Sequence, residues 1–127
     1  MRLHHVGIAC EDVDRAADLF GTLLETPVCH QESLESVATT FLELPAGYLE
    51  LLEPIGEGPV ARFLEREGPG IHHLAFETPA IEERLATADA AGIELIDDTP
   101  RRGAMGHRVA FLHPGDTGGV LLEYVEP

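Results

Sequence analysis

Hydrophobic residues along this chain recur with two periods, one typical of strands and one typical of helices. In the first part of the chain, four short segments are apolar or alternate between apolar and polar positions. One longer segment repeats its apolar residues every three to four positions, which indicates an amphipathic helix. These patterns predict strands at Arg2–Ala9, Val28–Ser33, Val37–Leu44 and Tyr48–Glu53, and a helix at Asp12–Leu24 that Asp12 caps.

The same order of elements returns in the second part of the chain. A short helix opened by a proline comes first, and the run GPG at positions 68–70 marks a boundary. A helix that Thr78 caps and Pro79 opens follows the next strand. The predicted elements are the linking helix Pro59–Glu65, the strand Ile71–Glu77, the helix to about Ala90, a loop at Arg101–Gly106, and strands at Ile93–Ile96, His107–Leu112 and Gly119–Tyr124.

Two sequence segments occur twice. LHHVGI at positions 3–8 returns as IHHLAF at 71–76, 68 residues later, and ELLEP at 50–54 returns as EYVEP at 123–127, 73 residues later. Each copy therefore reads as β-α-β-β-β, which is an α+β arrangement. We expect one domain over 1–127, with module one at about 1–55, a linker helix at about 56–69 and module two at about 70–127. Two such modules would form a curved sheet around a metal-binding cleft.

Each copy begins with two adjacent histidines, and strand geometry sends their side chains to opposite faces. The match between the copies pairs the histidines without deciding which of each pair faces the cleft. His5 shares its face with Gly7, and His73 shares its face with Ala75. Small residues leave room beside a bound ion, so we interpret His5 and His73 as ligands. The first histidine of each pair then lies on the opposite face.

Each copy ends with a glutamate inside an apolar strand. Glu50 stands between Leu49 and Leu51, and Glu123 occupies the matching position. A carboxylate in such a strand is costly to bury unless it is paired or bound to a metal. The alternative is a position that faces solvent. The second glutamate of each segment, Glu53 or Glu126, lies three residues further on and is expected to be solvated.

His5, Glu50, His73 and Glu123 together offer two imidazoles and two carboxylates. Such a set suits octahedral Co, Mn, Ni, Fe or Zn with two open positions, at which a substrate could chelate through two oxygens. A metal held in this way can polarise a carbonyl and stabilise an enolate. Cys10 and Cys29 have no paired metal-ligand spacing, so we expect both to pack in the core.

The composition is that of a globular protein with an unusual charge. Apolar residues make up 44% of the chain, and 23 acidic residues face 8 basic ones, giving a formal net charge of −15. Such a surface repels nucleic acid and anionic membranes. No apolar run suits a membrane helix and no leader pattern is present, so we expect a cytoplasmic protein. All the basic residues are Arg, and Lys is absent.

The residues described above resemble the vicinal oxygen chelate superfamily, and within it the methylmalonyl-CoA epimerase family. The resemblance runs along the whole chain. The segment with paired histidines is common in the superfamily, whereas the turn and strand HPGDTGGVLLE is more specific to the epimerases. The stretches that carry the resemblance are HHVGIA at 4–9, ELLEP at 50–54 through FL at 63–64, GIHHLAF at 70–76, FLHP at 111–114 and DTGGVLLE at 116–123.

The resemblance implies interconversion of (R)- and (S)-methylmalonyl-CoA by proton transfer at C2 through an enolate. It places the metal ligands at His5, Glu50, His73 and Glu123, with Co as the first candidate metal, and it implies an acyl-CoA substrate and a homodimer. Some epimerases carry a glutamate that is not a ligand on the third strand, proposed as one of two bases. The matching position here is Thr39, which cannot act as a base, and Glu35 and Glu43 are nearby without aligning.

Two catalytic carboxylates follow from this comparison. Glu123 is the first candidate for proton transfer, and Glu50 is the second. A cluster of basic residues before the last hairpin could meet the phosphates of coenzyme A, or it could simply offset the acidic surface. The members of this cluster are Arg101, Arg102, His107 and Arg108.

Three other functions fit parts of the pattern. A lactoylglutathione lyase would use the same four ligands on the same fold, although such enzymes favour a longer N-terminal part. An extradiol dioxygenase needs two histidines and one glutamate with iron, and the additional Glu50 argues against it. A ligand-binding protein of the bleomycin-resistance type would lack the metal set.

The acidic, Lys-free composition predicts dependence on salt. Such surfaces are typical of proteins from extreme halophiles, because molar salt screens the repulsion between carboxylates. We expect the far-UV circular dichroism of the protein to show loss of fold when KCl is lowered from molar to millimolar concentration. An unchanged spectrum would instead indicate an ordinary acidic protein with biased codon use.

Overall fold

The computed structural model describes residues 1–127 as two compact units. The first unit is His5–His72, and the second combines Met1–His4 with His73–Pro127. Each unit contains four strands in the order predicted from the repeat, so the expected α+β class with two β-α-β-β-β modules is confirmed. No helix in the structure combines the length and the apolar character that crossing a membrane requires.

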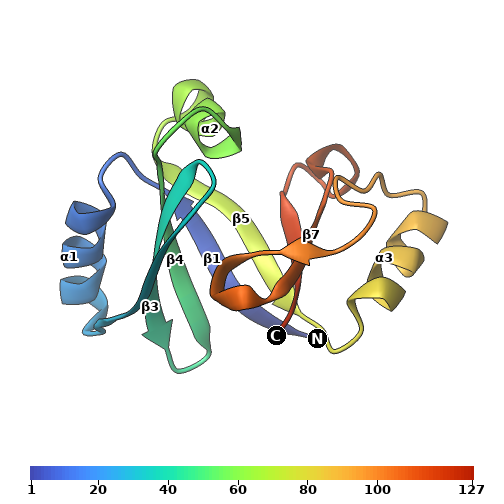
Figure 1. Cartoon of the computed structure of the whole chain (residues 1–127), viewed down its shortest axis with the longest axis horizontal. Coiled ribbons are helices and arrows are strands. Elements are labelled where there is room, and N and C mark those ends of the chain that lie inside the picture. The colour runs from blue at the N-terminus through green and yellow to red at the C-terminus, as the bar shows by residue number, and fades with distance from the viewer. The chain divides into compact units, whose positions relative to one another are not determined.

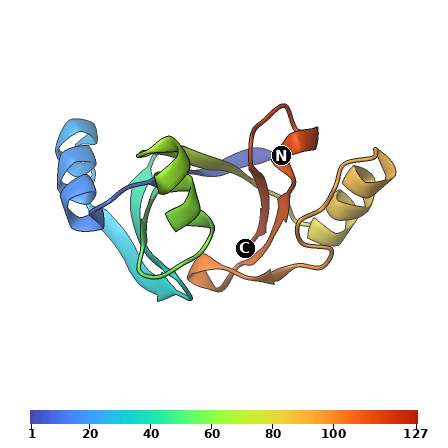
Figure 2. The same ribbon diagram turned by 90° about the horizontal axis from the view of Figure 1, so that it is seen from above.

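The first unit is a four-stranded sheet with one helix on each face (Figure 1, Figure 2). The strands lie in the order β2-β3-β4-β1, with β1 parallel to β4 and the other pairs antiparallel. Its elements are β1 (Arg2–Ala9, from His5 on in this unit), α1 (Val13–Leu24), β2 (Val28–Leu34), β3 (Val37–Leu44), β4 (Gly47–Pro54) and α2 (Pro59–Glu67).

Alternation along the strands divides this sheet into two apolar faces. Val13 and Ala17 of α1 pack with Leu42 and Leu51 on one face. On the other face, α2 covers only one end, where its residues pack with Leu52. The remainder of that second face carries the polar side chains described in the next subsection.

The second unit repeats the arrangement of the first. Its strands lie in the order β5-β8-β7-β6, with β5 parallel to β8, and α3 packs against β7 and β8 (Figure 1). Its elements are β5 (Gly70–Glu77, from His73 on in this unit), α3 (Ile81–Ala90), β6 (Arg101–Arg102), β7 (Arg108–Leu112), β8 (Leu122–Glu126) and 3-10 turns at Ala104–Gly106 and Pro114–Asp116.

Corresponding strand pairs have the same register in both units. In β1 and β4, Gly7 is the partner of Glu50, and in β5 and β8, Ala75 is the partner of Glu123. The small residue predicted to leave room beside a ligand is therefore directly opposite the glutamate in each unit.

Three predictions for the strands and loops of the second half were wrong. The segment around Leu95 forms one isolated bridge to Leu112 in place of a strand, because the carboxylate of Asp97 accepts the bond that Phe111 N–H would give to a strand partner (2.9 Å). The loop at 101–106 contains β6 and a 3-10 turn. The last strand starts only at Leu122, because Gly118 and Gly119 adopt left-handed backbone angles that interrupt it.

The two cysteines differ, although both were expected in the core. Cys10 is buried, and burial raises the pKa of its thiol to about 11. Cys29 is exposed, so the prediction was wrong for this residue. The cause is a register shift in β2 between Val28 and His30, since an extra residue in a strand is left outside the regular pairing.

The second glutamate of each repeated segment is bound to a helix start, and the expectation that both are solvated was wrong. Glu53 accepts a hydrogen bond from the backbone N–H of Val13, the first residue of α1 (2.7 Å). Glu126 accepts one from Ile81, the first residue of α3 (3.1 Å). For α3 this carboxylate replaces the cap predicted at Thr78. The helix begins two residues beyond Pro79, and the Thr78 hydroxyl accepts its bond from Ala80 N–H, which precedes the helix.

These contacts predict a loss of stability on removing either carboxylate. Glu53→Ala leaves the N–H of Val13 without its carboxylate acceptor, while Asp12 still caps the helix, so we expect the free energy of unfolding to fall by about 1 kcal/mol. Chemical denaturation at constant KCl measures the change, with Glu57→Ala as a control at an exposed position. Equal stability of the two variants would show that the bond to Val13 contributes nothing.

Candidate metal centre

The first unit buries a histidine and a glutamate side by side. His5 on β1 and Glu50 on β4 are 4% and 5% exposed, and His5 Nε2 lies 3.1 Å from Glu50 Oε1. The parallel pairing of β1 with β4 places both side chains on the same face of the sheet. Sequence reasoning predicted this pair, and the structure brings its two members together.

Neighbours on β3 hold this pair in place. Thr39 donates a hydrogen bond from Oγ1 to Glu50 Oε2 (2.8 Å), and the ring of Phe41 meets the His5 imidazole edge-to-face at a centroid distance of 5.8 Å. Both oxygens of Glu50 thus have contacts in the first unit, one with the imidazole and one with the hydroxyl. Thr39 cannot replace a base, but it orients the carboxylate.

The second unit contains a matching pair. His73 Nε2 lies 3.3 Å from Glu123 Oε1, and both side chains are buried. Phe111 meets the His73 ring edge-to-face at 5.5 Å, as Phe41 does for His5. The position that corresponds to Thr39 is Val109, a buried residue without a donor. The two pairs therefore share the phenylalanine contact and differ at the position of Thr39, which is Val109 in the second unit.

The other histidine of each doublet contacts an aromatic ring. His4 packs edge-to-face on His107 at 5.5 Å in the second unit, and His72 does the same on Phe63 at 5.0 Å in the first. The carboxylates of Glu50 and Glu123 instead lie against His5 and His73. The structure thus distinguishes the histidines within each doublet in the way that the neighbouring small residues predicted.

One acidic residue on the site face was missed by the sequence reasoning. Glu32 on β2 is opposite Thr39 in the β2–β3 register, and its Oε1 lies 2.7 Å from His30 Nε2. Cross-strand partners share a face, so Glu32 is on the same side of the sheet as Glu50. Alternation along β2 was the signal that could have found it. The two acids considered instead, Glu35 and Glu43, are exposed.

Two of the four members of the predicted basic cluster are engaged with carboxylates of their own unit. Arg108 forms hydrogen bonds with Glu82 and with Glu126, and its guanidinium lowers the pKa of the Glu82 carboxyl. Arg101 pairs with Asp97 at 3.1 Å. These contacts favour the interpretation that the arginines offset the acidic surface.

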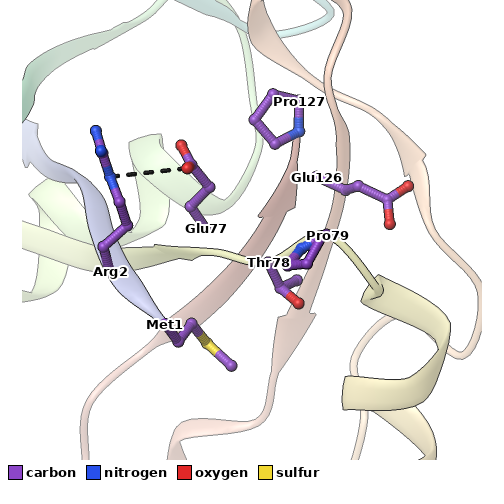
Figure 3. Close-up of a pocket in the computed structure, with 7 residues that line it drawn as sticks. All are labelled: Met1, Arg2, Glu77, Thr78, Pro79, Glu126 and Pro127. Atoms are coloured by element: carbon purple, nitrogen blue, oxygen red, sulfur yellow. Dashed lines mark ion pairs between the residues drawn. The ribbon is translucent and has the colours of Figure 1, made fainter.

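A hollow of about 820 Å³ in the second unit lies beside the chain ends (Figure 3). Met1 and Pro127 line it, and the ion pair between Arg2 and Glu77 (3.7 Å) lies at its side. Neither ligand candidate of this unit is among its lining residues, so the hollow is no part of the candidate metal centre.

Comparison with known families identifies the superfamily to which the chain belongs. Residues 4–111 match the family described as the glyoxalase/bleomycin resistance protein/dioxygenase superfamily. The chain belongs to this superfamily. The match begins at His4, before the first ligand candidate, and includes the starts of both modules.

Full-length relatives within the superfamily include epimerases. The chain is 40% identical to an "Ethylmalonyl-CoA/methylmalonyl-CoA epimerase" of Cereibacter sphaeroides, over 96% of this chain and 95% of the relative. It is 39% identical to the uncharacterized protein YqjC of Bacillus subtilis, over 99% and 92% of the two chains. The sequence resemblance to methylmalonyl-CoA epimerases is thereby confirmed.

Solved structures of superfamily members show the same fold. A Streptomyces coelicolor methylmalonyl-CoA epimerase variant in complex with 2-nitronate-propionyl-CoA is 37% identical, with a TM-score of 0.95. The match covers 99% of this chain and 94% of that one. The expected vicinal oxygen chelate fold is therefore confirmed, and a relative of this chain binds an acyl-CoA ligand.

The hydroxyl of Thr39 predicts a measurable effect on metal affinity. Groups that orient a ligand typically contribute about 10- to 100-fold to metal binding, so Thr39→Val should raise the Kd for Co²⁺ by at least about tenfold. Isothermal titration calorimetry on chelator-treated protein measures this. Thr40→Val is the matched control, because Thr40 is equally buried and is opposite Leu51 on the other face. Equal affinity in both variants would contradict the assigned role.

Proposed function

We propose that this protein is a methylmalonyl-CoA epimerase that interconverts (R)- and (S)-methylmalonyl-CoA. The observation that carries the proposal is the recurrence of one buried histidine–glutamate pair, with the same phenylalanine contact, in both modules. A relative that is 40% identical over nearly its whole length is named as an epimerase of this substrate.

The chemistry of the donor set fits a divalent metal ion. The residues proposed as its ligands are His5, Glu50, His73 and Glu123, two neutral nitrogen donors and two carboxylates on buried side chains. Co is the first candidate, and Mn, Ni, Zn and Fe have compatible preferences. When bound, such an ion would polarise the thioester and carboxylate oxygens of the substrate and so acidify the proton at C2.

The protein's own groups then have to move the proton. Epimerisation needs one group that removes the C2 proton from one face and another that returns a proton to the opposite face. We assign Glu123 to one of these transfers. Glu50 is the candidate that the sequence offers for the other. Apolar neighbours around both pairs keep bulk water from the carboxylates and so favour transfer to the substrate.

We further propose that the chain works as a single domain on this acyl-CoA substrate. The module bounds of about 1–55, 56–69 and 70–127 then describe its internal repeat. A homodimer is the assembly that the family resemblance implies.

Exchange of the C2 proton tests the proposed function. Methylmalonyl-CoA is incubated in D₂O at high KCl with protein that has been treated with a chelator and then reloaded with Co²⁺, and loss of the C2 proton is followed by NMR. We expect rapid exchange with racemisation in the reloaded protein and a loss of at least about 100-fold without metal, on the scale of lost acid–base catalysis.

The control is folded protein kept free of metal, with its fold checked by circular dichroism. Folded, metal-loaded protein that leaves the C2 proton in place would contradict the epimerase function. The hemithioacetal of glutathione and methylglyoxal would then be the next substrate to test. A protein that takes up no metal at all would instead indicate a ligand-binding role.

A further inference from the structure

We propose that Glu32, oriented by His30, is the proton acceptor for one stereoisomer of the substrate, in the place that Glu50 was expected to take. This inference rests on the proposed epimerase function and adds a residue that neither the repeat nor the family resemblance identifies. It is carried by the register of β2 with β3 and by the contacts that already engage Glu50.

The first step concerns Glu50. Its Oε1 lies 3.1 Å from His5 Nε2, and its Oε2 accepts the hydrogen bond from Thr39 (2.8 Å). A carboxylate whose two oxygens are both engaged is well placed to hold an ion. It is poorly placed to approach a C–H bond, because it would have to break one of these contacts first.

The second step concerns the position of Glu32. In the antiparallel pair of β2 and β3, Glu32 is the partner of Thr39, and such partners have Cβ atoms about 4.5–5.5 Å apart on one face. The Thr39 hydroxyl in turn touches Glu50. Glu32 is thus one cross-strand step beyond the contacts of Glu50. Its carboxylate is on the same face as the candidate ligands of the first unit.

The third step concerns access and orientation. The Glu32 side chain is 26% exposed, so a substrate can reach it, whereas the Glu50 side chain is only 7% exposed. His30 Nε2 lies 2.7 Å from Glu32 Oε1, and the His30 ring lies against Phe41 at 5.9 Å. The imidazole therefore orients the carboxylate that we assign as the proton acceptor.

The reaction that follows is balanced. The C2–H bond breaks and the proton moves to the Glu32 carboxylate. The electron pair of the C2–H bond enters the enolate formed with the thioester. Glu123 returns a proton from the opposite face, and the C2–H bond forms again with inverted configuration. Solvent exchange restores both carboxyl groups, and no oxidant or further reactant is required.

Thr39 explains why this chain would use β2. The family resemblance aligns Thr39 with a glutamate that is proposed as a base in some epimerases. A hydroxyl there removes that group, and Glu32 is the residue directly across from it. In this proposal the carboxylate that accepts the proton lies on β2, whereas the resemblance places it on β3 in those epimerases.

The test uses the two stereoisomers separately, since each base serves one face. Deuterium incorporation at C2 in D₂O is measured for (R)- and for (S)-methylmalonyl-CoA with Co²⁺-loaded Glu32→Gln. We expect exchange from one stereoisomer to fall by at least about 100-fold, while the other exchanges with retention at close to the wild-type rate. Bound Co²⁺ per chain should be unchanged.

Two further variants make the result specific. Glu35→Gln removes an exposed acid in the turn next to β2 and should exchange both stereoisomers as the wild type does. Glu32→Asp keeps a carboxylate on a shorter side chain, so it should slow the same stereoisomer as Glu32→Gln but to a smaller extent. If Glu32→Gln does not fold, the exchange rates of the two stereoisomers in Glu32→Asp test the role of Glu32.

The outcomes separate the two proposals. Wild-type protein without exchange overturns the epimerase function, and the role of Glu32 fails with it. Active wild type together with Glu32→Gln that exchanges both stereoisomers normally overturns only the role of Glu32. Equal slowing of both stereoisomers with loss of Co²⁺ would show that Glu32 supports the metal site and is not a proton acceptor.

Discussion

The structure depends on the burial of a carboxylate beside an imidazole inside each sheet. Glu50 and Glu123 are 5% and 6% exposed in strands whose other residues are mostly apolar. An unpaired charge there would cost several kcal/mol, on the order of the penalty for a buried ion, so every neighbour has to compensate. A small partner on the parallel strand leaves space, a histidine approaches one oxygen, and a phenylalanine fixes the ring. Both modules contain the same histidine–glutamate contact with the same phenylalanine neighbour. This recurrence indicates that the histidine–glutamate pair is the structural feature that the two sheets have in common.

The repeated glutamate segment has two functions within four residues. Its first glutamate faces the candidate metal centre, and its second accepts the first N–H of the helix packed on the other face of the sheet. Three positions along a strand separate the two, so alternation sends them to opposite faces. Helix position and ligand position are therefore coupled through one short strand in each module. The modules differ in what supports the first glutamate, which is the Thr39 hydroxyl in one and the apolar Val109 in the other.

The sequence predicted the parts of the fold that depend on local period and on repetition. The strand Arg2–Ala9, the helix capped by Asp12 and the four ligand candidates follow from alternation, helical spacing and matched copies, and the structure has the His–Glu pairs in contact. The failures depend on partners far along the chain. Asp97 takes the place of a strand partner for Phe111, Glu126 caps a helix 45 residues away, and a bulge exposes Cys29. Alternation along β2 could have singled out Glu32, but its place opposite Thr39 follows only from the register of β2 with β3.

The central proposal is that the two histidine–glutamate pairs serve a single ion. The most direct measurement is the stoichiometry of Co²⁺ binding to chelator-treated protein at high KCl, with wild type compared with His5→Ala and His73→Ala. The account predicts one Co²⁺ per chain in the wild type and loss of that ion in either variant, because the proposal assigns half of the ligands to each module. Two ions per chain, with one remaining in each variant, would show that the pairs bind metal independently and would contradict the account.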